Sequence, residues 1–150
     1  MKLHPQEIQA RFRRQAVRVT RQRAAIYAAL AETTSHPTAD DLYRLVKRQQ
    51  PMMSRNTVYY TLGVLRKAGL VQEVNVGHDV ARFDGNVSIH HHLICLGCGQ
   101  IMDVMDEGLN RLDLSSEQAK GFHVVGHRVE FHGYCASCRQ AKPDASPRRG

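Results

Sequence analysis

The sequence lacks any apolar run long enough to cross a membrane, and no apolar signal-peptide core follows Met1. It also has no internal repeat. We therefore expect a cytoplasmic protein with no membrane partner. Its 150 residues allow one ordinary domain or two small ones, and a hydrophobic fraction of 42% is enough to form a core.

Acidic residues are absent between Arg11 and Arg23, a span that carries six arginines. The whole chain has a net charge of +7. A solvated helix face usually mixes charges of both signs, so this unbalanced run favours contact with the phosphates of a nucleic acid. Arg18 is the residue of the run that we assign to this contact. An ordinary basic surface is the alternative interpretation.

Cysteine is scarce, and all four cysteines stand in two C-x-x-C pairs, Cys95 with Cys98 and Cys135 with Cys138. Two such loops can aim four thiolates at one ion and complete the tetrahedral shell of a structural zinc site. The alternatives are a pair of disulfides or a redox C-x-x-C. Two matched pairs with no cysteine left over favour the zinc site.

Three histidines, His90, His91 and His92, precede the first cysteine pair. When zinc takes the thiolates, these imidazoles remain for another role. The spacing of His90 and His92 places both on one face of a strand, with His91 on the other. Nitrogen and oxygen ligands suit Mn²⁺ or Fe²⁺ better than a thiolate site does. The stretch therefore predicts a second, sensed metal beside the structural one.

Four helices are predicted in the first 70 residues, over about 5–15, 21–31, 39–50 and 55–67. Thr20 and Ser54 are expected to cap the second and fourth, and Thr38 with Asp41 resembles a capping box. Gly69 stands where a left-handed residue ends the fourth helix. The residues expected to face the core are Ile26, Tyr27, Leu30, Leu42, Leu45, Val46, Val58, Leu62 and Leu65.

Two strands follow, at 70–76 and 80–84, with a turn at 77–79. Helices closed by such a hairpin form a winged helix-turn-helix. The helix that begins after Ser54 would then enter the major groove with its N-terminal side chains. An amphipathic surface helix is the alternative. The outward side chains predicted to contact DNA are Arg55, Asn56, Thr57, Tyr59 and Tyr60.

The remainder of the chain predicts a second small unit after a polar linker at 85–89. Two short strands should flank the first cysteine pair, and a helix should run from about 106 to 120 and end at Gly121. Residues 122–132 alternate like a strand, with Val125, Val129 and Phe131 on one side. The tail, 139–150, lacks apolar character and should be disordered.

The order of these motifs resembles the ferric uptake regulator (Fur) family of metal-dependent repressors. The matching pieces are VRVTRQR (17–23), HPTADDLY (36–43), SRNTVYYTL (54–62), AGLV (68–71), RFD (82–84), HHHLICLGCG (90–99) and GYCASC (133–138). The resemblance implies an α+β fold, with a winged-helix DNA-binding domain over 1–84 and an α/β dimerisation domain over 90–138. It implies a homodimer on a pseudo-palindromic double-stranded DNA operator, and a regulator rather than an enzyme.

The resemblance also implies a regulatory metal between the two domains. Carried over to this sequence, its ligands are His36, Asp84, His90, His92 and Asp103. Three imidazoles and two carboxylates form a shell suited to Fe²⁺ or Mn²⁺. Because these ligands come from both halves of the chain, binding of the ion would fix one arrangement of the halves.

Iron-sensing members usually carry Glu at the two carboxylate positions, whereas this chain has Asp84 and Asp103. In this it resembles the peroxide-stress regulator (PerR) branch, in which peroxide oxidises a histidine that binds Fe²⁺. The resemblance makes His36 and His90 the oxidation-sensitive residues. Iron or zinc sensing is the first alternative, and haem sensing through His90 and His92 is more remote.

The chain departs from the family at a third metal site. His91 and His127 are available for it, but Asn110 replaces the expected Glu and Ile89 an expected His, so we expect that site to be weak or absent. Tyr60 is unusual in the recognition helix and predicts a deviating operator. A zinc enzyme would need an open zinc position for water, which a shell of four cysteines does not leave.

Overall fold

The computed structural model describes residues 3–75 and 80–141 of the chain. These residues form two compact units, which divide between Val87 and Ser88, inside the predicted linker at 85–89. The turn predicted at 77–79 and the tail from residue 142 lie outside the described residues. Among the helices of the described part, none has both the length and the apolar character of a membrane span.

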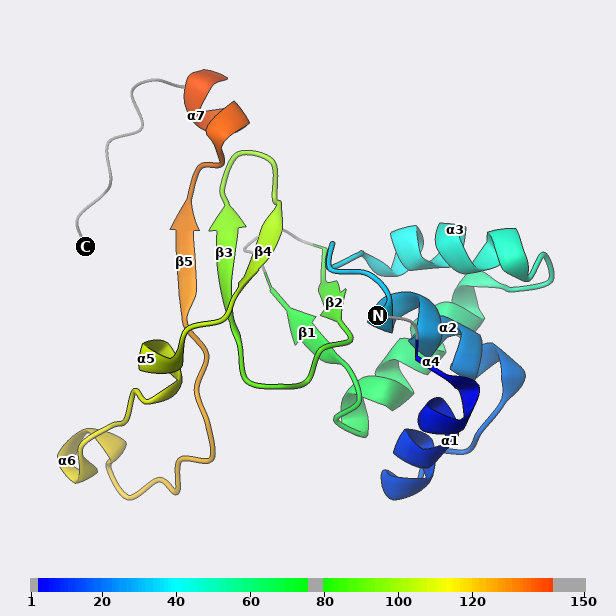
Figure 1. Cartoon of the computed structure of the whole chain (residues 1–150), viewed down its shortest axis with the longest axis horizontal. Coiled ribbons are helices and arrows are strands. Elements are labelled where there is room, and N and C mark those ends of the chain that lie inside the picture. Colours follow the sequence, from blue (N-terminus) through cyan, green and yellow to red (C-terminus); the bar gives the residue numbers. More distant parts are fainter. Residues whose placement is uncertain (1–2, 76–79, 142–150) are drawn as a thin grey trace. The chain divides into compact units, whose positions relative to one another are not determined.

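The N-terminal unit contains helices followed by a small sheet (Figure 1). Its elements are α1 (Pro5–Arg14), α2 (Arg21–Ala31), α3 (Ala39–Gln49), α4 (Arg55–Lys67), β1 (Gln72–Val74) and β2 (Arg82–Asp84). The order of these elements and the bounds of the helices follow the prediction closely. The two strands are shorter than the predicted 70–76 and 80–84, and residue 76 lies outside the described residues.

Hydroxyl side chains begin three of these helices. The Thr20 hydroxyl accepts a hydrogen bond from the third residue of α2, and Ser54 does the same for α4. At α3 both halves of a capping box are present, since Thr38 accepts from the Asp41 N–H and the Asp41 carboxylate accepts from the Thr38 N–H. Each cap satisfies backbone donors that the helix itself leaves without a partner, so the predicted starts are confirmed.

The end of α4 leads directly into the wing. Gly69 adopts a φ of +67°, and its N–H donates to the Arg66 carbonyl while the Leu70 N–H donates to the Leu65 carbonyl. This pair of bonds is the Schellman arrangement, which reverses the chain after a helix. The two strands that follow pair antiparallel, with Gln72 opposite Asp84. The predicted winged helix-turn-helix is therefore confirmed.

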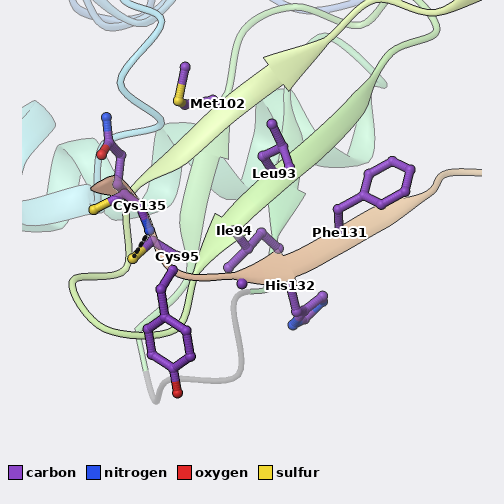
Figure 2. Close-up of a pocket in the computed structure, with 10 residues that line it drawn as sticks. Leu93, Ile94, Cys95, Met102, Phe131, His132 and Cys135 are labelled. Carbon is purple, nitrogen blue, oxygen red and sulfur yellow. Dashed lines mark hydrogen bonds between the residues drawn. The ribbon is translucent and has the colours of Figure 1, made fainter. Parts of the chain in front are cut away.

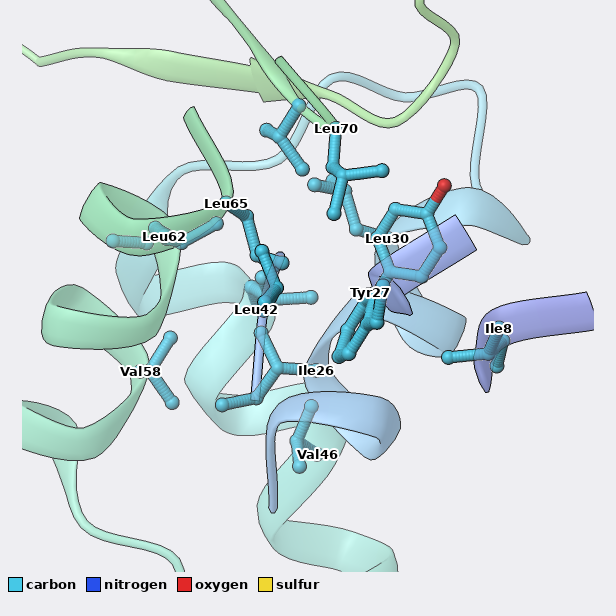
Figure 3. Packing of buried hydrophobic residues seen from close by; sticks show 14 of the residues in the cluster. Ile8, Ile26, Tyr27, Leu30, Leu42, Val46, Val58, Leu62, Leu65 and Leu70 are labelled. Atoms are coloured by element: carbon cyan, nitrogen blue, oxygen red, sulfur yellow. The ribbon is translucent and has the colours of Figure 1, made fainter. Parts of the chain in front are cut away.

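A continuous apolar core holds the N-terminal unit together (Figure 3). Ile26, Tyr27 and Leu30 of α2 lie at its centre and are fully buried. The prediction was wrong at one position: Leu45 is 40% exposed. Leu42 and Val46 are four residues apart on α3 and define its buried stripe, so Leu45 lies at the edge of that stripe.

The C-terminal unit is built on a three-stranded sheet with the order β4-β3-β5. Its elements are β3 (His91–Cys95), β4 (Ile101–Val104), α5 (Glu107–Asn110), α6 (Ser116–Ala119), β5 (Glu130–Gly133) and α7 (Ala136–Ala141). The central strand, β3, pairs antiparallel with β4 and parallel with β5. The strands predicted around the first cysteine pair are thus confirmed.

The single helix predicted over 106–120 is wrong, because α5 and α6 each span only four residues. Between them, Asp113 accepts a hydrogen bond from the Leu114 N–H, and Ser115 caps α6 by accepting from the Gln118 N–H. Short polar side chains that bond nearby backbone N–H groups compete with a continuous helix. Lys120, with a φ of +47°, then ends α6.

Two further predictions for this unit need correction. The strand expected over 122–132 is regular only as β5, because pairing with β3 begins at Glu130, opposite His92. Alternation alone did not reveal where the partner strand begins. The tail expected to be disordered from residue 139 is helical as far as Ala141, the last residue of α7.

Candidate metal centres and nucleic-acid interface

The four cysteines converge in the C-terminal unit. Cys95 ends β3, Cys98 lies in the turn toward β4, Cys135 follows β5 and Cys138 lies in α7. Parallel pairing of β3 with β5 sets Cys95 opposite Gly133, two residues before Cys135, so the sheet brings the two loops together. All four sulfur atoms lie within 4.8 Å of one another.

The geometry of this cluster fits a zinc ion. The sulfur atoms of Cys98 and Cys135 are 3.8 Å apart. Zn–S bonds of about 2.3 Å in a tetrahedron place neighbouring sulfur atoms about 3.8 Å apart. A disulfide needs about 2.05 Å, and all four thiols are free. The spacing therefore suits tetrahedral coordination and not the disulfide alternative.

The surroundings shift the pKa values of two of these thiols in opposite directions. Backbone N–H groups, led by that of Cys135, donate to the Cys95 sulfur and lower the pKa of this thiol to about 6. Hydrogen bonds with the neighbouring thiols, first that of Cys135, raise the pKa of Cys138 to about 12. Thiolates are the zinc-binding form, so metal binding at this cluster releases protons.

Gly97 is required for the close approach of the two loops. A Cβ atom added to Gly97 would lie 2.8 Å from the Cys138 sulfur and 2.9 Å from the Cys138 Cβ. Real side chains do not approach this closely, so a larger residue would displace Cys138. The sequence search for ligands missed Gly97 because its role depends on a residue far along the chain.

One face of the sheet carries an exposed apolar row (Figure 2). Leu93 of β3 lies between Met102 of β4 and Phe131 of β5, its partners in the strand register. These side chains are 47%, 53% and 42% exposed, respectively. They line a shallow pocket that also reaches Cys95 and Cys135. A lone chain therefore leaves apolar surface uncovered on this sheet.

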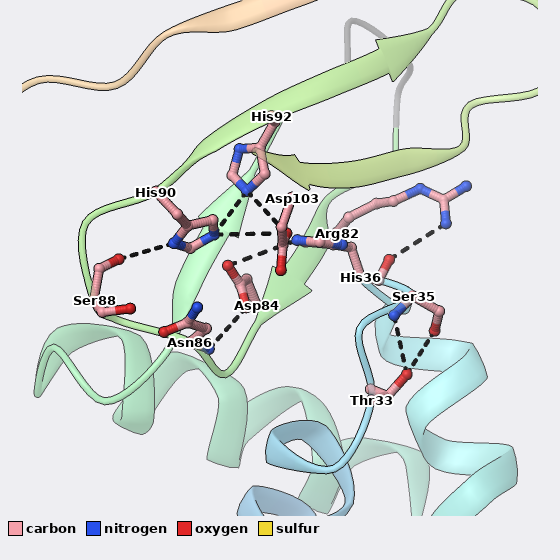
Figure 4. Close-up of polar contacts among 10 residues, drawn as sticks. All are labelled: Thr33, Ser35, His36, Arg82, Asp84, Asn86, Ser88, His90, His92 and Asp103. Atoms are coloured by element: carbon pink, nitrogen blue, oxygen red, sulfur yellow. Dashed lines mark hydrogen bonds and ion pairs between the residues drawn. The ribbon is translucent and has the colours of Figure 1, made fainter. Parts of the chain in front are cut away.

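The C-terminal unit also gathers three of the predicted ligands of the regulatory metal (Figure 4). The Nε2 atoms of His90 and His92 are 3.0 Å apart, and they lie 3.7 and 3.8 Å from Asp103 Oδ1. Metal–ligand bonds of about 2.1 Å place neighbouring donors about 3 to 3.5 Å apart. Cross-strand pairing of His92 with Asp103 produces this arrangement.

The His90 ring is oriented by a hydrogen bond at its Nδ1 atom. Its Nδ1 lies 2.8 Å from the Ser88 carbonyl, which can only accept, so Nδ1 carries the proton and Nε2 offers a lone pair. A hydrogen bond from the second ring nitrogen to a carbonyl is the usual way in which a histidine ligand is fixed. The donor set thus presents two imidazole nitrogens and a carboxylate on one side of the strand.

The N-terminal unit holds the other two predicted ligands. His36 Nε2 lies 3.6 Å from Asp84 Oδ2, and both side chains are buried (Figure 4). The loop that carries His36 is tied to β2, since the Phe83 N–H donates to the Pro37 carbonyl. We predict that the two groups of ligands bind one ion. The structure describes each group within its own unit.

Arg82 is a residue of this region that the sequence did not identify. Its guanidinium donates to the His36 carbonyl at 3.3 Å, across 46 positions of sequence. His36 has a φ of +48°, a left-handed conformation that is uncommon for residues other than glycine. Arg82 and the strand pairing beside it therefore hold a strained residue in place. No local pattern signals such a contact.

His91 and His127, the residues predicted for a weak third site, bond to protein groups. The Val129 N–H donates to His91 Nδ1 at 3.1 Å, so the opposite nitrogen, Nε2, carries the proton and donates to Asn110 Oδ1 at 3.0 Å. His127 Nε2 donates to the Leu109 carbonyl at 2.6 Å. Both ring nitrogens of His91 are thus used within the unit.

The first turns of α4 are exposed, as expected of a recognition helix. Tyr59 is 54% and Tyr60 67% exposed, and Asn56 is also at the surface. The Arg23 guanidinium lies 5.9 Å from the centre of the Tyr60 ring. Residues at the start of α2 and the start of α4 line one polar hollow. They are Thr20, Gln22, Arg23, Asn56, Thr57, Tyr60 and Thr61.

The arginines near the N-terminus differ in their surroundings. Arg11 forms an ion pair with Glu7 at 2.7 Å and donates to the Tyr27 hydroxyl at 3.0 Å, bonds that raise its pKa, the one to Tyr27 most. Arg18 is exposed, and its carbonyl accepts from the Arg23 side chain. Arg11 therefore helps to hold α1 on α2, while Arg18 keeps its guanidinium at the surface.

Known proteins are similar to this chain in sequence and in fold. Residues 14–132 match the ferric uptake regulator family. The peroxide operon regulator of Bacillus subtilis is 43% identical over 122 residues, which cover 81% of this chain and 84% of that protein.

Solved structures are similar as well. PerR from Streptococcus pyogenes, solved in a study of peroxide sensing and gene regulation, is 31% identical and has a TM-score of 0.50, with 89% of this chain and 92% of that one covered. The ferric uptake regulator Fur of Helicobacter pylori shares the fold with a TM-score of 0.74 at 17% identity, covering 92% of this chain and 95% of that one. The chain belongs to the ferric uptake regulator family.

Proposed function

We propose that this protein is a metal-dependent transcriptional repressor that releases DNA in response to peroxide. It works in the cytoplasm as a homodimer on a pseudo-palindromic operator. The observation that carries the proposal is the set of nitrogen and oxygen donors, His36 with Asp84 in one unit and His90, His92 and Asp103 in the other. The similarity to the peroxide operon regulator of Bacillus subtilis supports the peroxide response.

Two metals have different tasks in this proposal. Zn²⁺ at Cys95, Cys98, Cys135 and Cys138 is structural, because four thiolates close the shell and leave no position for water. Fe²⁺ or Mn²⁺ takes the nitrogen and oxygen donors, which suit these harder ions. Since those donors come from both units, the bound ion favours one arrangement of the units, and that arrangement is the one that binds DNA.

Peroxide acts at the histidines. Ferrous iron held by these donors would supply the electron that cleaves the O–O bond of peroxide. Overall, one hydrogen peroxide would give one oxygen atom and the two-electron oxidation to a histidine, and its other oxygen would leave as water. His36 and His90 are the expected sites of oxidation, and an oxidised imidazole is a poorer donor to the metal. The His90 ring is fixed by its bond to the Ser88 carbonyl, so its Nε2 points consistently toward the other donors. The change is stoichiometric and not catalytic turnover.

DNA is contacted by the N-terminal unit. The exposed Asn56, Tyr59 and Tyr60 and the partly exposed Thr57 stand at the start of α4, the part of a recognition helix that meets base edges. Arg18 adds a phosphate contact. The exposed apolar row of the C-terminal sheet, Leu93, Met102 and Phe131, supports a second copy of the chain as the partner that covers it.

The decisive experiment measures operator binding by the full-length protein loaded with Fe²⁺ or Mn²⁺, with and without hydrogen peroxide. A suitable duplex can be selected from a random-sequence pool with the Mn²⁺ form. We expect both forms to bind, and only the Fe²⁺ form to release the duplex after peroxide and gain one oxygen at His36 or His90. Mass spectrometry of the treated protein locates the oxygen.

One outcome would redirect the proposal. If both histidines stay unmodified while DNA remains bound, the protein is an iron or manganese sensor. Asp103→Glu provides a matched variant, because it keeps the charge and lengthens the side chain by one methylene. We expect it to retain metal-dependent DNA binding and to oxidise more slowly than the native protein.

A further inference from the structure

Arg55, the first residue of α4, is held by α3. Its guanidinium forms an ion pair with the Asp40 carboxylate and lies 4.8 Å from the centre of the Tyr43 ring. Sequence reasoning placed Arg55 among the DNA contacts, since arginine at this end of a recognition helix suits purine edges and phosphates. In the structure the same side chain is engaged within the N-terminal unit.

The groups that receive Arg55 form a stripe on α3. Asp40, Tyr43 and Lys47 are spaced by three and four residues, so they lie on one face of that helix. Tyr43 packs against the apolar core, and the Lys47 ammonium lies 5.0 Å from its ring centre. Asp40 is in the first turn of α3, where the helix dipole favours a carboxylate. The side chains that hold Arg55 are therefore fixed by α3 and by the packing of Tyr43 against the core.

The position of Arg55 at the start of α4 explains why its positive charge needs the Asp40 carboxylate. A cation at the first residue of a helix is disfavoured by the helix dipole, and α4 has no acidic residue in its first turn. The carboxylate that offsets this charge comes from Asp40, 15 residues earlier in the chain. Other side chains at the start of α4, such as Asn56 and Tyr60, instead line the polar hollow with α2.

We propose that Asp40 determines DNA specificity by holding Arg55 along α3, so that the recognition helix reads bases through Asn56, Tyr59 and Tyr60. The inference rests on the proposed DNA-binding function. Without the Asp40 carboxylate, Arg55 becomes a mobile cation at the DNA-facing end of α4. Such a cation contacts phosphate in any sequence, which strengthens non-specific binding more than specific binding.

The test uses the full-length Mn²⁺ form of Asp40→Asn and measures affinity for the selected duplex and for an unrelated duplex of equal length, at several salt concentrations. Glu32→Gln is the matched control, since it removes one negative charge from an exposed residue after α2. One added phosphate contact steepens the slope of log affinity against log salt by about 0.9, which is about 3.5-fold between 50 and 200 mM.

We expect Asp40→Asn to show this steeper slope and tighter binding to the unrelated duplex, and Glu32→Gln to show neither. Asp40→Glu, which keeps the carboxylate, should retain the native slope. Adding Arg55→Gln to Asp40→Asn should restore the native slope, and Arg55→Gln alone should leave it unchanged. Thermal unfolding of each variant verifies that the N-terminal unit remains folded.

Three results would overturn the inference. Equal increases in slope for Asp40→Asn and Glu32→Gln would mean that the effect comes from the net charge of the protein and not from Arg55. A gain that persists in the double variant would assign the effect to a residue other than Arg55. If Arg55→Gln alone lowered the slope of log affinity against log salt by about 0.9, Arg55 would already contact DNA in the native protein. Failure of the native Mn²⁺ form to bind any duplex would instead refute the proposed function, and the inference with it.

Discussion

The two units of this protein are stabilised in different ways. In the N-terminal unit, side chains from all four helices form one buried apolar cluster. In the C-terminal unit, the buried apolar residues among those described are Ile94, Cys95 and Ile101, while many large apolar side chains are exposed. A unit with so small a core needs another source of folding free energy, and the four clustered cysteines offer it through a metal.

This contrast concerns what stabilises each unit, since the predicted regulatory ligands come from both units. The N-terminal unit has the rigid core that a recognition helix requires, because side chains that read bases must be held in fixed positions. The C-terminal unit combines a cysteine cluster suited to zinc with an exposed apolar face. We therefore expect its stability to depend on metal and, in our proposal, on a second copy. The four experiments below test this division, beginning with the largest expected effect.

Loss of a cysteine should unfold one unit and spare the other. Cys95→Ser is expected to release about one zinc per chain and to unfold the C-terminal unit, since structural zinc contributes about 10–16 kcal/mol to folding in small zinc domains. Zinc analysis and heteronuclear NMR spectra measure both effects. Met105→Ser, at a side chain that is 67% exposed in the same unit, is the control and should keep the zinc. A zinc-free Cys95→Ser protein with a folded C-terminal unit would contradict the contrast.

A cavity in the apolar core should have the opposite pattern. Leu62→Ala removes a side chain that is 1% exposed, and the expected loss is about 2–5 kcal/mol from the unfolding free energy of the N-terminal unit. Zinc content should not change. Met52→Ala, at a side chain that is 91% exposed, should change stability by no more than about 0.5 kcal/mol. Loss of zinc from Leu62→Ala would show that the two units depend on each other for folding.

Crowding the zinc loops should weaken the site without removing a ligand. Gly97→Ala places a Cβ atom against Cys138, so zinc affinity should fall about 10- to 100-fold, the range typical of changes beside metal ligands. Competition with a chromogenic chelator measures the affinity. A Cβ atom at Gly133, in the same unit, meets no atom within 4 Å, so Gly133→Ala should bind zinc like the native protein. Equal affinities for the two variants would mean that the loops are not tightly packed.

The smallest effect is expected at the capping box of α3. Hydrogen bonds from Thr38, first that of its side chain, lower the pKa of Asp41. The resulting stability is present above the unfolded pKa of about 3.9 and is lost as the pH falls through the lower folded value. Asp41→Ala should therefore cost about 0.5 kcal/mol at pH 6, a modest value because the side chain is 45% exposed.

That cost should shrink as the pH is lowered from 6 to about 2, because the native carboxylate takes up a proton as the pH falls toward its lowered pKa. Chemical unfolding of the N-terminal unit at the two pH values measures the difference. Asp106→Ala, which removes the cap of α5 in the C-terminal unit, should leave this transition unchanged. A pH-independent cost of Asp41→Ala would mean that the charge of Asp41 contributes nothing to the cap.

Local chemistry explains how much of the fold could be predicted. Thr20, Ser54 and the Thr38–Asp41 pair act on backbone groups within three residues, and Gly69 acts on the turn in which it lies. Such signals do not depend on the remainder of the protein, so the helix bounds followed from the sequence. The candidate zinc ligands could also be predicted, because the chain contains just two matched cysteine pairs.

Other features depend on residues that are distant in sequence. The length of β5 is set by where it meets β3. His91, a residue predicted for the third site, bonds to Asn110 and to the Val129 N–H.

The split of the predicted 106–120 helix has a local cause that the periodicity of apolar residues did not reveal. Asp113 and Ser115 favour bonds to nearby backbone groups over the hydrogen bonds of a continuous helix.

The sequence by itself determined the family, the boundaries of the four N-terminal helices and the candidate metal-binding side chains, because each rests on residue type and short spacing. Only the tertiary structure decided which side chains are already engaged. Asp40 with Arg55, Arg82 with the His36 carbonyl, and Gly97 with Cys138 are pairs joined by the fold and separated along the chain. The physical reason is that charge pairing, strain and close packing depend on distances in space, which no local pattern encodes.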